Sequence, residues 1–316
     1  EIENSGTITK DEVNKNQEVI NNVNILNEDN VLENLEQYQT NSGYYSYTTT
    51  KPEIYNIDGK EKLVYISPRE IVSNDTRTYN NKTYEYTHGY GAIISSANSV
   101  DENGNLEYIQ SDFKGEDNKV KITQPRIYFG LQTNEPIVTN AKNKQEYDYP
   151  LTSTTSNTNT YEGKAGLKLG FLDRIILGVK EKNLGIAFSG NVTKESRIIT
   201  TRNIITRAKT IMPYLKYDEE PYMVVTDEGK LVWVLDAYTT SNDYPYSQET
   251  IIEYGGLKEK INYIRNSVKV IIDAYDGTTD FYITDKSDPI AIAYSNIYPE
   301  LFKDGEEIPQ DISKHM

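Results

Sequence analysis

The chain has 316 residues, which is long enough for one large domain or two ordinary ones. It contains 27 tyrosines, and its formal net charge of -15 indicates an acidic surface. This charge balance excludes a nucleic-acid partner, because proteins that bind nucleic acids need a basic stripe that displaces counterions from phosphates. The chain has no cysteine, so it can form neither disulfides nor cysteine metal sites. Its two histidines, His88 and His315, are too few for a histidine-rich metal centre, and no metal or cofactor is expected.

Residues 1–40 are expected to form an N-terminal helical segment. The stretch is polar, and its apolar residues recur at the loose spacing of helical faces. Thr9 or Asp11 can cap a first helix, and Asp29 or Asn30 a second. We therefore predict one or two short helices packed on the edge of a domain.

From about Tyr44 the apolar period changes to two, which predicts a first β-rich part over residues 41–150. Asp58-Gly59 between two such runs suits the type I′ turn of a tight hairpin. Three strand pairs are expected: 53–57 with 62–66, 90–95 with 106–109, and 126–130 with 136–139.

Residues 151–160 form a polar, low-complexity stretch, which we interpret as a loop and as the best candidate linker. It separates the first part from a second, α+β part over residues 161–316. The two parts can also form one continuous domain.

Two helices are expected in the middle of the chain. Residues 167–179 are apolar on most sides, which favours a buried helix; the alternative is a helix that docks on a membrane or on a partner protein. Ser196 is the expected N-cap of a second helix, which Pro213 ends.

One short sequence motif, the repeated phrase, occurs twice, as Leu231–Tyr238 and again as Val268–Tyr275. Because side chains alternate along a strand, each copy has one apolar face, and its other face ends in an aspartate and a tyrosine. The repeat therefore predicts two strands of one packed sheet. With the remaining patterns it predicts an α+β fold, with hairpin-rich antiparallel sheets and N-terminal and central helices.

The polar ends of the two copies are the first candidate site, consisting of Asp236 and Tyr238 with Asp273 and Tyr275. A pair of carboxylates suggests glycosidase chemistry, but an aspartate at a strand end more often accepts backbone hydrogen bonds in the adjoining turn. Arg265 can clamp a carboxylate or phosphate ligand, or pair internally with Asp236 or Asp273.

The second candidate is His88 with Tyr90, in a segment with two glycines that indicate a tight turn or a close approach. A neutral histidine there can act as a general base. Since no nucleophile with a stated partner accompanies it, we expect a structural, hydrogen-bonding histidine. No residue is assigned as catalytic, and the site residues named here are candidates for ligand binding.

Several segments together resemble the large bacterial membrane-protein family numbered 0182 in the UPF (uncharacterised protein family) series. They stand in order at 86–91, 125–130, 195–198, 236–247 and 262–277. The resemblance runs from about Asn24 to His315. One departure is that residues 202–208 are less basic than the family pattern, which weakens any role for them as a cationic docking strip.

The resemblance implies that the chain is the first portion of the extracytoplasmic part of a multi-pass protein, beyond a bundle of transmembrane helices. No apolar run in the chain reaches the roughly 18–20 residues of a membrane span, and Glu1 is no initiator methionine. We therefore expect a piece of a longer protein, at the outer face of the bacterial cell membrane. The resemblance implies no activity and no catalytic residues, because none is established for the family.

These observations favour a non-enzymatic binding or assembly module for envelope components. Its expected partners are the transmembrane helices and downstream domain of its own parent chain, with an envelope glycan, lipid or protein as ligand. The alternative is a cell-envelope hydrolase or transferase that uses His88 with Asp236 or Asp273.

Overall fold

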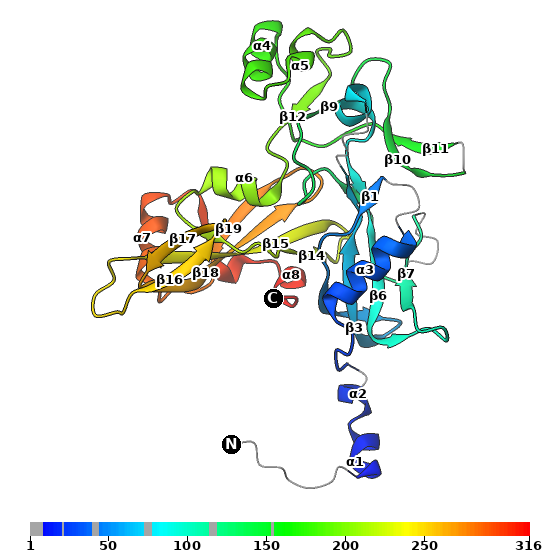
Figure 1. Cartoon of the computed structure of the whole chain (residues 1–316), viewed down its shortest axis with the longest axis vertical. Coiled ribbons are helices and arrows are strands. Elements are labelled where there is room, and N and C mark those ends of the chain that lie inside the picture. Colours follow the sequence, from blue (N-terminus) through cyan, green and yellow to red (C-terminus); the bar gives the residue numbers. More distant parts are fainter. Residues whose placement is uncertain (1–8, 21, 40–43, 73–77, 114–118, 153–154) are drawn as a thin grey trace.

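The computed structural model describes residues 9–20, 22–39, 44–72, 78–113, 119–152 and 155–316. The expectations for residues 1–8 and 153–154 fall outside these ranges. Helices and antiparallel strands are mixed along the chain, so the α+β prediction is confirmed (Figure 1).

The N-terminal segment contains helices α1 (Lys10–Lys15), α2 (Gln17–Ile20) and α3 (Glu28–Gln39). Thr9 caps α1 as predicted, in a capping box with Glu12. Helix α3 packs Val31 and Leu35 on a sheet, whereas α1 buries no residue and lies at one end of the molecule (Figure 1).

A four-stranded antiparallel sheet follows, with strand order β2-β3-β6-β7. Asp58 and Gly59 join β2 to β3 with φ angles of 53° and 79°, the two positive values that a type I′ turn requires. Both hairpins predicted here are confirmed. The strands are β2 (Lys51–Ile57), β3 (Lys60–Pro68), β6 (Ala92–Val100) and β7 (Leu106–Gln110).

The second large sheet has six strands and contains both copies of the repeated phrase. Strand β15 pairs with β18 in antiparallel register, and the apolar faces of both copies are buried in the main core, as predicted. The indole N–H of Trp233 donates to the Phe129 carbonyl oxygen at 2.8 Å. The strands are β13 (Lys216–Tyr217), β14 (Tyr222–Val225), β15 (Leu231–Ser241), β18 (Tyr263–Asp273), β19 (Thr279–Ile283) and β20 (Phe302–Asp304).

Helices cover both faces of this sheet. α6 (Ile204–Ile211) and α7 (Pro289–Ile297) place Ala208 and Ala291 in the main core, while α8 (Gln310–Ser313) places Ile312 against the opposite face. The predicted helix start at Ser196 is wrong. Asn203 is the N-cap of α6, because the residues before it form strand β12 (Arg197–Ile199).

Short strand pairs connect the two large sheets. The expected pairing of 126–130 with 136–139 is wrong, because each segment finds a distant partner instead. β5 (Gly89–Tyr90) pairs with β8 (Arg126–Ile127), β9 (Ile137–Thr139) with β12, and β1 (Tyr45–Ser46) with β4 (Glu70–Ile71).

Two further ribbons are β10 (Glu146–Pro150) with β11 (Ser156–Asn159), and β16 (Thr250–Tyr254) with β17 (Leu257–Ile261). The predicted 151–160 loop is therefore partly a strand. The main apolar core takes residues from both predicted parts, among them Ile66 and Trp233.

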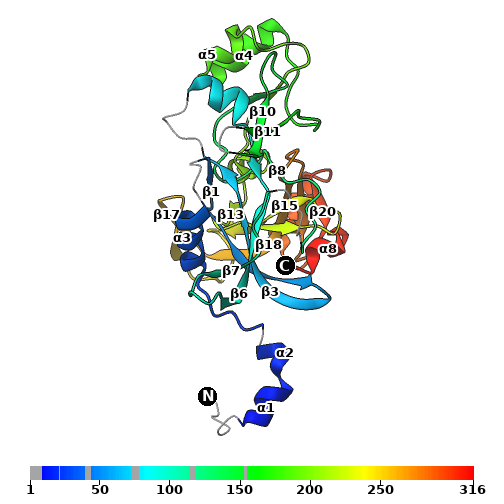
Figure 2. The ribbon, with the colours of Figure 1, turned by 90° about the vertical axis from the view of Figure 1, so that its right-hand side faces the viewer.

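Helices α4 (Phe171–Lys180) and α5 (Leu184–Phe188) form an arm at the end of the molecule opposite α1 (Figures 1 and 2). The helix predicted at 167–179 begins only at Phe171, because Leu167 forms a backbone bridge with Ile198. Leu177 and Ile186 anchor the arm in a small apolar cluster with Val138 and Ile198. A π-helical turn at Asn81–Glu85 adds Tyr84 to the same cluster.

Candidate functional site

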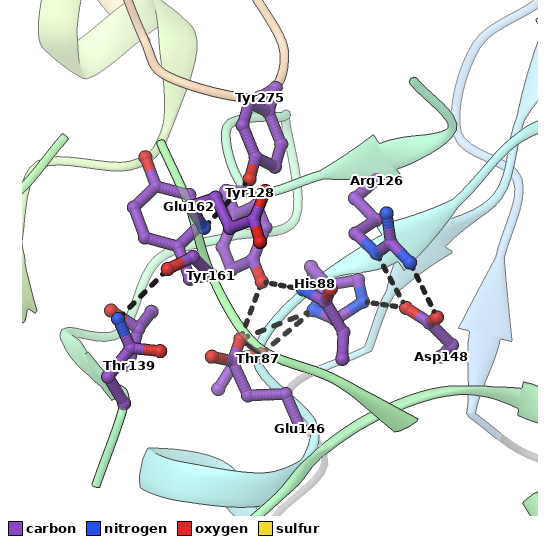
Figure 3. A network of polar contacts seen from close by, with 12 residues as sticks. Thr87, His88, Arg126, Tyr128, Thr139, Glu146, Asp148, Tyr161, Glu162 and Tyr275 are labelled. Carbon is purple, nitrogen blue, oxygen red and sulfur yellow. Dashed lines mark hydrogen bonds and ion pairs between the residues drawn. The ribbon is translucent and has the colours of Figure 1, made fainter. Parts of the chain in front are cut away.

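His88 lies inside a buried polar network that joins the ends of β5, β8 and β10 (Figure 3). Its ring is fully buried. Gly89, which follows His88, allows the Arg69 backbone to approach closely, because a Cβ atom at position 89 would lie 2.1 Å from the Arg69 carbonyl oxygen. This close approach explains Gly89, whereas Gly91 is explained by its positive φ angle of 66°.

Both ring nitrogens of His88 are engaged. Nδ1 lies 2.9 Å from the Thr87 hydroxyl, and Nε2 lies 2.9 Å from a carboxylate oxygen of Asp148. Thr87 donates its own proton to Glu146 at 2.6 Å, as does Tyr128 at 2.5 Å. Because the Thr87 proton is directed at Glu146, the Thr87 hydroxyl oxygen faces Nδ1 of His88 as an acceptor.

Asp148 is the acceptor at the centre of the network. Arg126 donates two hydrogen bonds of 2.8 Å to its carboxylate, and Asn157 donates a third at 3.0 Å. Burial acts to raise the pKa of Asp148, but the hydrogen bonds and charges of His88 and Arg126 outweigh it, so that this pKa lies below its ordinary value. Asp148 is therefore held as a carboxylate.

Arg202 completes the network from the segment before α6. Its guanidinium donates to the backbone carbonyls of Tyr128 at 2.8 Å and Glu135 at 3.2 Å, and also to that of Thr87. Burial lowers the pKa of Arg202 to about 10. This arginine is an internal clamp of the backbone and not a surface cation.

The structure corrects the enzyme hypothesis at this point. That hypothesis requires His88 to work with Asp236 or Asp273, but both of its ring nitrogens are used by Thr87 and Asp148. Because the ring is enclosed, it is not available as a general base for a ligand. The structural interpretation of His88 fits this geometry.

Tyr90 lies at the edge of the network in a half-buried aromatic group. Its ring centroid is 4.9 Å from that of Tyr149, which stacks on Phe113, and the Arg126 guanidinium lies 6.0 Å from the Tyr90 centroid. Burial and the Asp148 charge raise the pKa of Tyr90 to about 12.

The antiparallel pairing separates the two repeat aspartates. Asp236 lies opposite Lys269, whereas Asp273 lies opposite Val232, four residues away along β15. At about 3.3 Å per residue the two positions are about 13 Å apart along the sheet. They do not form the carboxylate pair that glycosidase chemistry needs.

The residues on β15 and β18 have internal partners. Asp236 accepts from Asn266 and pairs with Lys269, and Tyr238 donates to Asp218 at 3.2 Å. Burial and the neighbouring Asp218 charge raise the pKa of Tyr238 to about 12.

Arg265 pairs with Asp285 and donates to Ser287 at 2.8 Å. Its expected pairing with Asp236 or Asp273 is therefore wrong.

Asp273 and Tyr275 lie at the other end of the repeat. Asp273 accepts the backbone N–H groups of Tyr275 and Asp276 at 2.7 and 3.0 Å, as expected for an aspartate that caps a turn. The Tyr275 oxygen accepts from the Glu162 backbone N–H, and its ring packs against Tyr128 of the buried network. The side chain of Tyr275 thus reaches the surroundings of His88.

Sequence reasoning missed four members of the His88 network, namely Asp148, Glu146, Arg126 and Arg202. A signal for two of them exists, because Glu146 and Asp148 are two positions apart in a tyrosine-alternating strand and therefore share one face. Nothing local in the sequence indicates that this face meets His88, some 60 residues earlier.

The arm formed by α4 and α5 carries a group of exposed apolar side chains. Leu172 is 73 % exposed and Ile176 is 69 % exposed, and Phe171 and Phe188 contact each other with ring centroids 6.4 Å apart. We call the following set the arm surface: Leu167, Phe171, Leu172, Ile176, Val179, Leu184 and Phe188, each more than half exposed. The expectation of a buried helix is therefore wrong for most of α4.

The arm also differs in charge from the rest of the molecule. Residues 163–197 contain seven Lys and Arg against three Asp and Glu, a net charge of +4 in a chain of -15. A large apolar patch with a charged rim is typical of an interaction site.

Two further kinds of functional feature are absent from the described ranges. No group of three or more His, Asp or Glu side chains there is arranged to hold a metal ion. None of the helices that the structure describes is both long and apolar enough to cross a membrane.

A family model described as an uncharacterised protein family, UPF0182, matches residues 1–316. The chain belongs to this family. A UPF0182 protein of Clostridium tetani is 44 % identical over 315 residues, covering 99 % of this chain and 34 % of that protein. For UPF0182 proteins of Caldicellulosiruptor saccharolyticus and Clostridium acetobutylicum the identities are 42 % and 40 %, covering 100 % and 98 % of this chain and 34 % of each relative.

The chain therefore spans about a third of the length of these UPF0182 relatives. No solved structure matches it.

Proposed function

We propose that this chain is an extracytoplasmic part of a multi-pass membrane protein and that it works as an assembly module. Its arm surface packs on a segment of the parent protein that lies outside these 316 residues. The observation that carries the proposal is the exposure of seven large apolar side chains on α4, α5 and the residue Leu167.

The size of the relatives supports a partner within the same protein. Two thirds of each compared relative has no counterpart in this chain, so a long stretch of parent sequence is available to cover the arm surface. The resemblance to a family of multi-pass proteins supports the placement outside the membrane.

The chemistry of the arm surface defines the segment that fits it. Apolar side chains form its centre, and the net positive charge of residues 163–197 includes Arg174, Lys180 and Lys182 on or next to α4, beside the acidic Asp173 and Glu181. A matching segment presents apolar residues with an acidic rim, since interfaces combine a dry apolar core with a polar rim. Burying a single leucine or isoleucine side chain there is worth about 2 kcal/mol.

Cysteine labelling tests this proposal, because the chain has no cysteine of its own. Ile176→Cys is compared with Leu257→Cys, which has similar exposure (69 % and 67 %) but lies on the β17 ribbon. In the 316-residue chain, both cysteines should react quickly with a maleimide. In the full-length parent, Ile176→Cys should be protected while Leu257→Cys stays reactive.

The same pair of variants tests the location. In intact cells that express the parent, a membrane-impermeant maleimide should label Leu257→Cys without lysis. Labelling of Leu257→Cys only after lysis would refute the extracytoplasmic placement, and equal labelling of Ile176→Cys in chain and parent would refute the assembly role.

A further inference from the structure

Residues of α6, β13 and the β16–β17 ribbon line a cleft of about 470 Å³. The helix α6 and the β16–β17 ribbon lie away from the arm (Figure 1). Volumes of a few hundred Å³ are typical of small-molecule sites. The side chains that give this cleft its chemical character are Lys209, Tyr214, Lys216, Tyr254, Glu259 and Lys260.

The cleft is basic although the chain is acidic. Three lysines line it against one carboxylate, that of Glu259. Repulsion of an anion by the distant carboxylates of the chain is screened over about 10 Å at 0.1 M salt, whereas the ammonium groups in the cleft act at contact distance. The local charge therefore favours an anionic ligand.

Tyr254 organises two of these lysines. The ammonium nitrogens of Lys209 and Lys216 lie 4.9 and 4.7 Å from the centroid of its ring. The ring itself is fixed, because its phenol oxygen accepts the Tyr217 backbone N–H at 2.9 Å. Two positive charges are thus held at one aromatic platform by cation–π attraction.

Of the two ammonium groups, that of Lys216 forms an ion pair with the Glu259 carboxylate. Lys260 pairs with Glu249 at 3.5 Å across the ribbon. Within the described ranges, no carboxylate lies at ion-pair distance from Lys209. An arriving anion can therefore bind Lys209 directly and compete with Glu259 for Lys216.

Tyr214, also in the lining of the cleft, offers a surface for a sugar ring. Tyr214 is 57 % exposed and stacks on Tyr294 of α7, with ring centroids 6.1 Å apart. Thr240, Ser241 and Asn242 add polar groups to the lining. Aromatic faces beside hydroxyl and amide groups suit the apolar faces and hydroxyls of a pyranose.

We propose that this cleft binds a sugar that carries a phosphate group. The phosphate lies between Lys209 and Lys216 and displaces the Glu259 carboxylate, and the sugar lies against Tyr214. No bond is made or broken. The site is independent of the arm surface, so this proposal stands or falls separately from the assembly role.

Calorimetric titration of the 316-residue chain with glucose 1-phosphate tests the proposal, with glucose and inorganic phosphate as separate probes. Saturable binding of glucose 1-phosphate is expected, and both other probes should bind more weakly. Lys209→Gln should weaken binding about tenfold, as expected for the loss of a charge-assisted contact. Glu259→Gln should tighten it roughly threefold, since the competing, partly buried ion pair with Lys216 is removed.

Matched variants control for overall charge. Lys303→Gln and Glu228→Gln make the same charge changes at surface ion pairs on β20 and before β15 and should leave binding unchanged. Absence of saturable binding, equal binding of inorganic phosphate, or equal effects of control and cleft variants would each overturn the proposal. Thermal melts confirm that every variant is folded.

Discussion

At the scale of single residues, the buried network depends on the Asp148 carboxylate. It is the common acceptor for His88, Arg126 and Asn157, which come from three separate parts of the chain. Removing the charge of one member of such a buried set leaves the others uncompensated, which costs more than the intact pair contributes.

We predict that Asp148→Asn lowers the free energy of unfolding by about 3 kcal/mol, measured by urea denaturation at pH 7. The pKa of Asp148 is lowered in the folded state, so this stabilisation is present above the unfolded pKa of about 4 and is lost as the pH falls through the folded value. The difference between wild type and Asp148→Asn should therefore shrink in acid.

Asp243→Asn is the matched control, since Asp243 is exposed, and it should change stability by less than about 0.5 kcal/mol. An Asp148→Asn difference that is the same at pH 3 and pH 7 would contradict the electrostatic account of the network.

Residue identity alone could not predict this network. Of the two glycines near His88, Gly89 marks a close approach to the Arg69 backbone and Gly91 a turn with positive φ, so both alternatives read from the sequence occur. The carboxylates that meet His88 come from a strand some 60 residues later, and that meeting depends on the pairing of β5 with β8 and on the path of β10.

At the scale of elements, α4 shows how an apolar helix can keep most of its surface exposed. Leu177 faces the cluster beneath the arm, whereas Ile176, its neighbour in sequence, points away from it. Composition predicts burial for both residues, but the fold provides packing partners on one side of α4 only.

We predict opposite results for two adjacent substitutions in this helix. Leu177→Asp should lower the free energy of unfolding by about 3 kcal/mol or more, because it buries an unpaired carboxylate. Ile176→Asp should change it by less than about 0.5 kcal/mol, as at other exposed positions. Thermal melts of the two variants in the 316-residue chain measure both. Equal destabilisation would show that the arm surface is covered within this chain.

Local sequence patterns predicted some elements of the fold, but not the pairing of strands that are far apart in the sequence. The Asp58-Gly59 hairpin and the repeated strands follow from period-two patterns and turn chemistry, so both could be predicted. The partners of 126–130 and 136–139 could not, because strand pairing across tens of residues leaves no mark in either segment.

At the scale of the whole molecule, the two predicted halves contribute to one apolar core. Ile66 and Ile94 from the four-stranded sheet belong to the same cluster as Trp233 and Val270 from the six-stranded sheet. Neither sheet buries that face without the other, so the two should unfold together.

We predict a single cooperative transition in urea for the 316-residue chain. Fluorescence of Trp233, the only tryptophan, reports on the core between the sheets, and far-ultraviolet circular dichroism reports on all elements. The two curves should coincide. Separate midpoints would show that the sheets form independent cores.

In the proposed function, the arm is an interface that a further part of a longer parent protein covers. The ratio of maleimide labelling rates of Ile176→Cys in the 316-residue chain and in the full-length parent measures this most directly, with Leu257→Cys as reference. We predict that Ile176→Cys reacts far more slowly in the parent while the reference rate is unchanged; a ratio of one at Ile176→Cys would contradict the account.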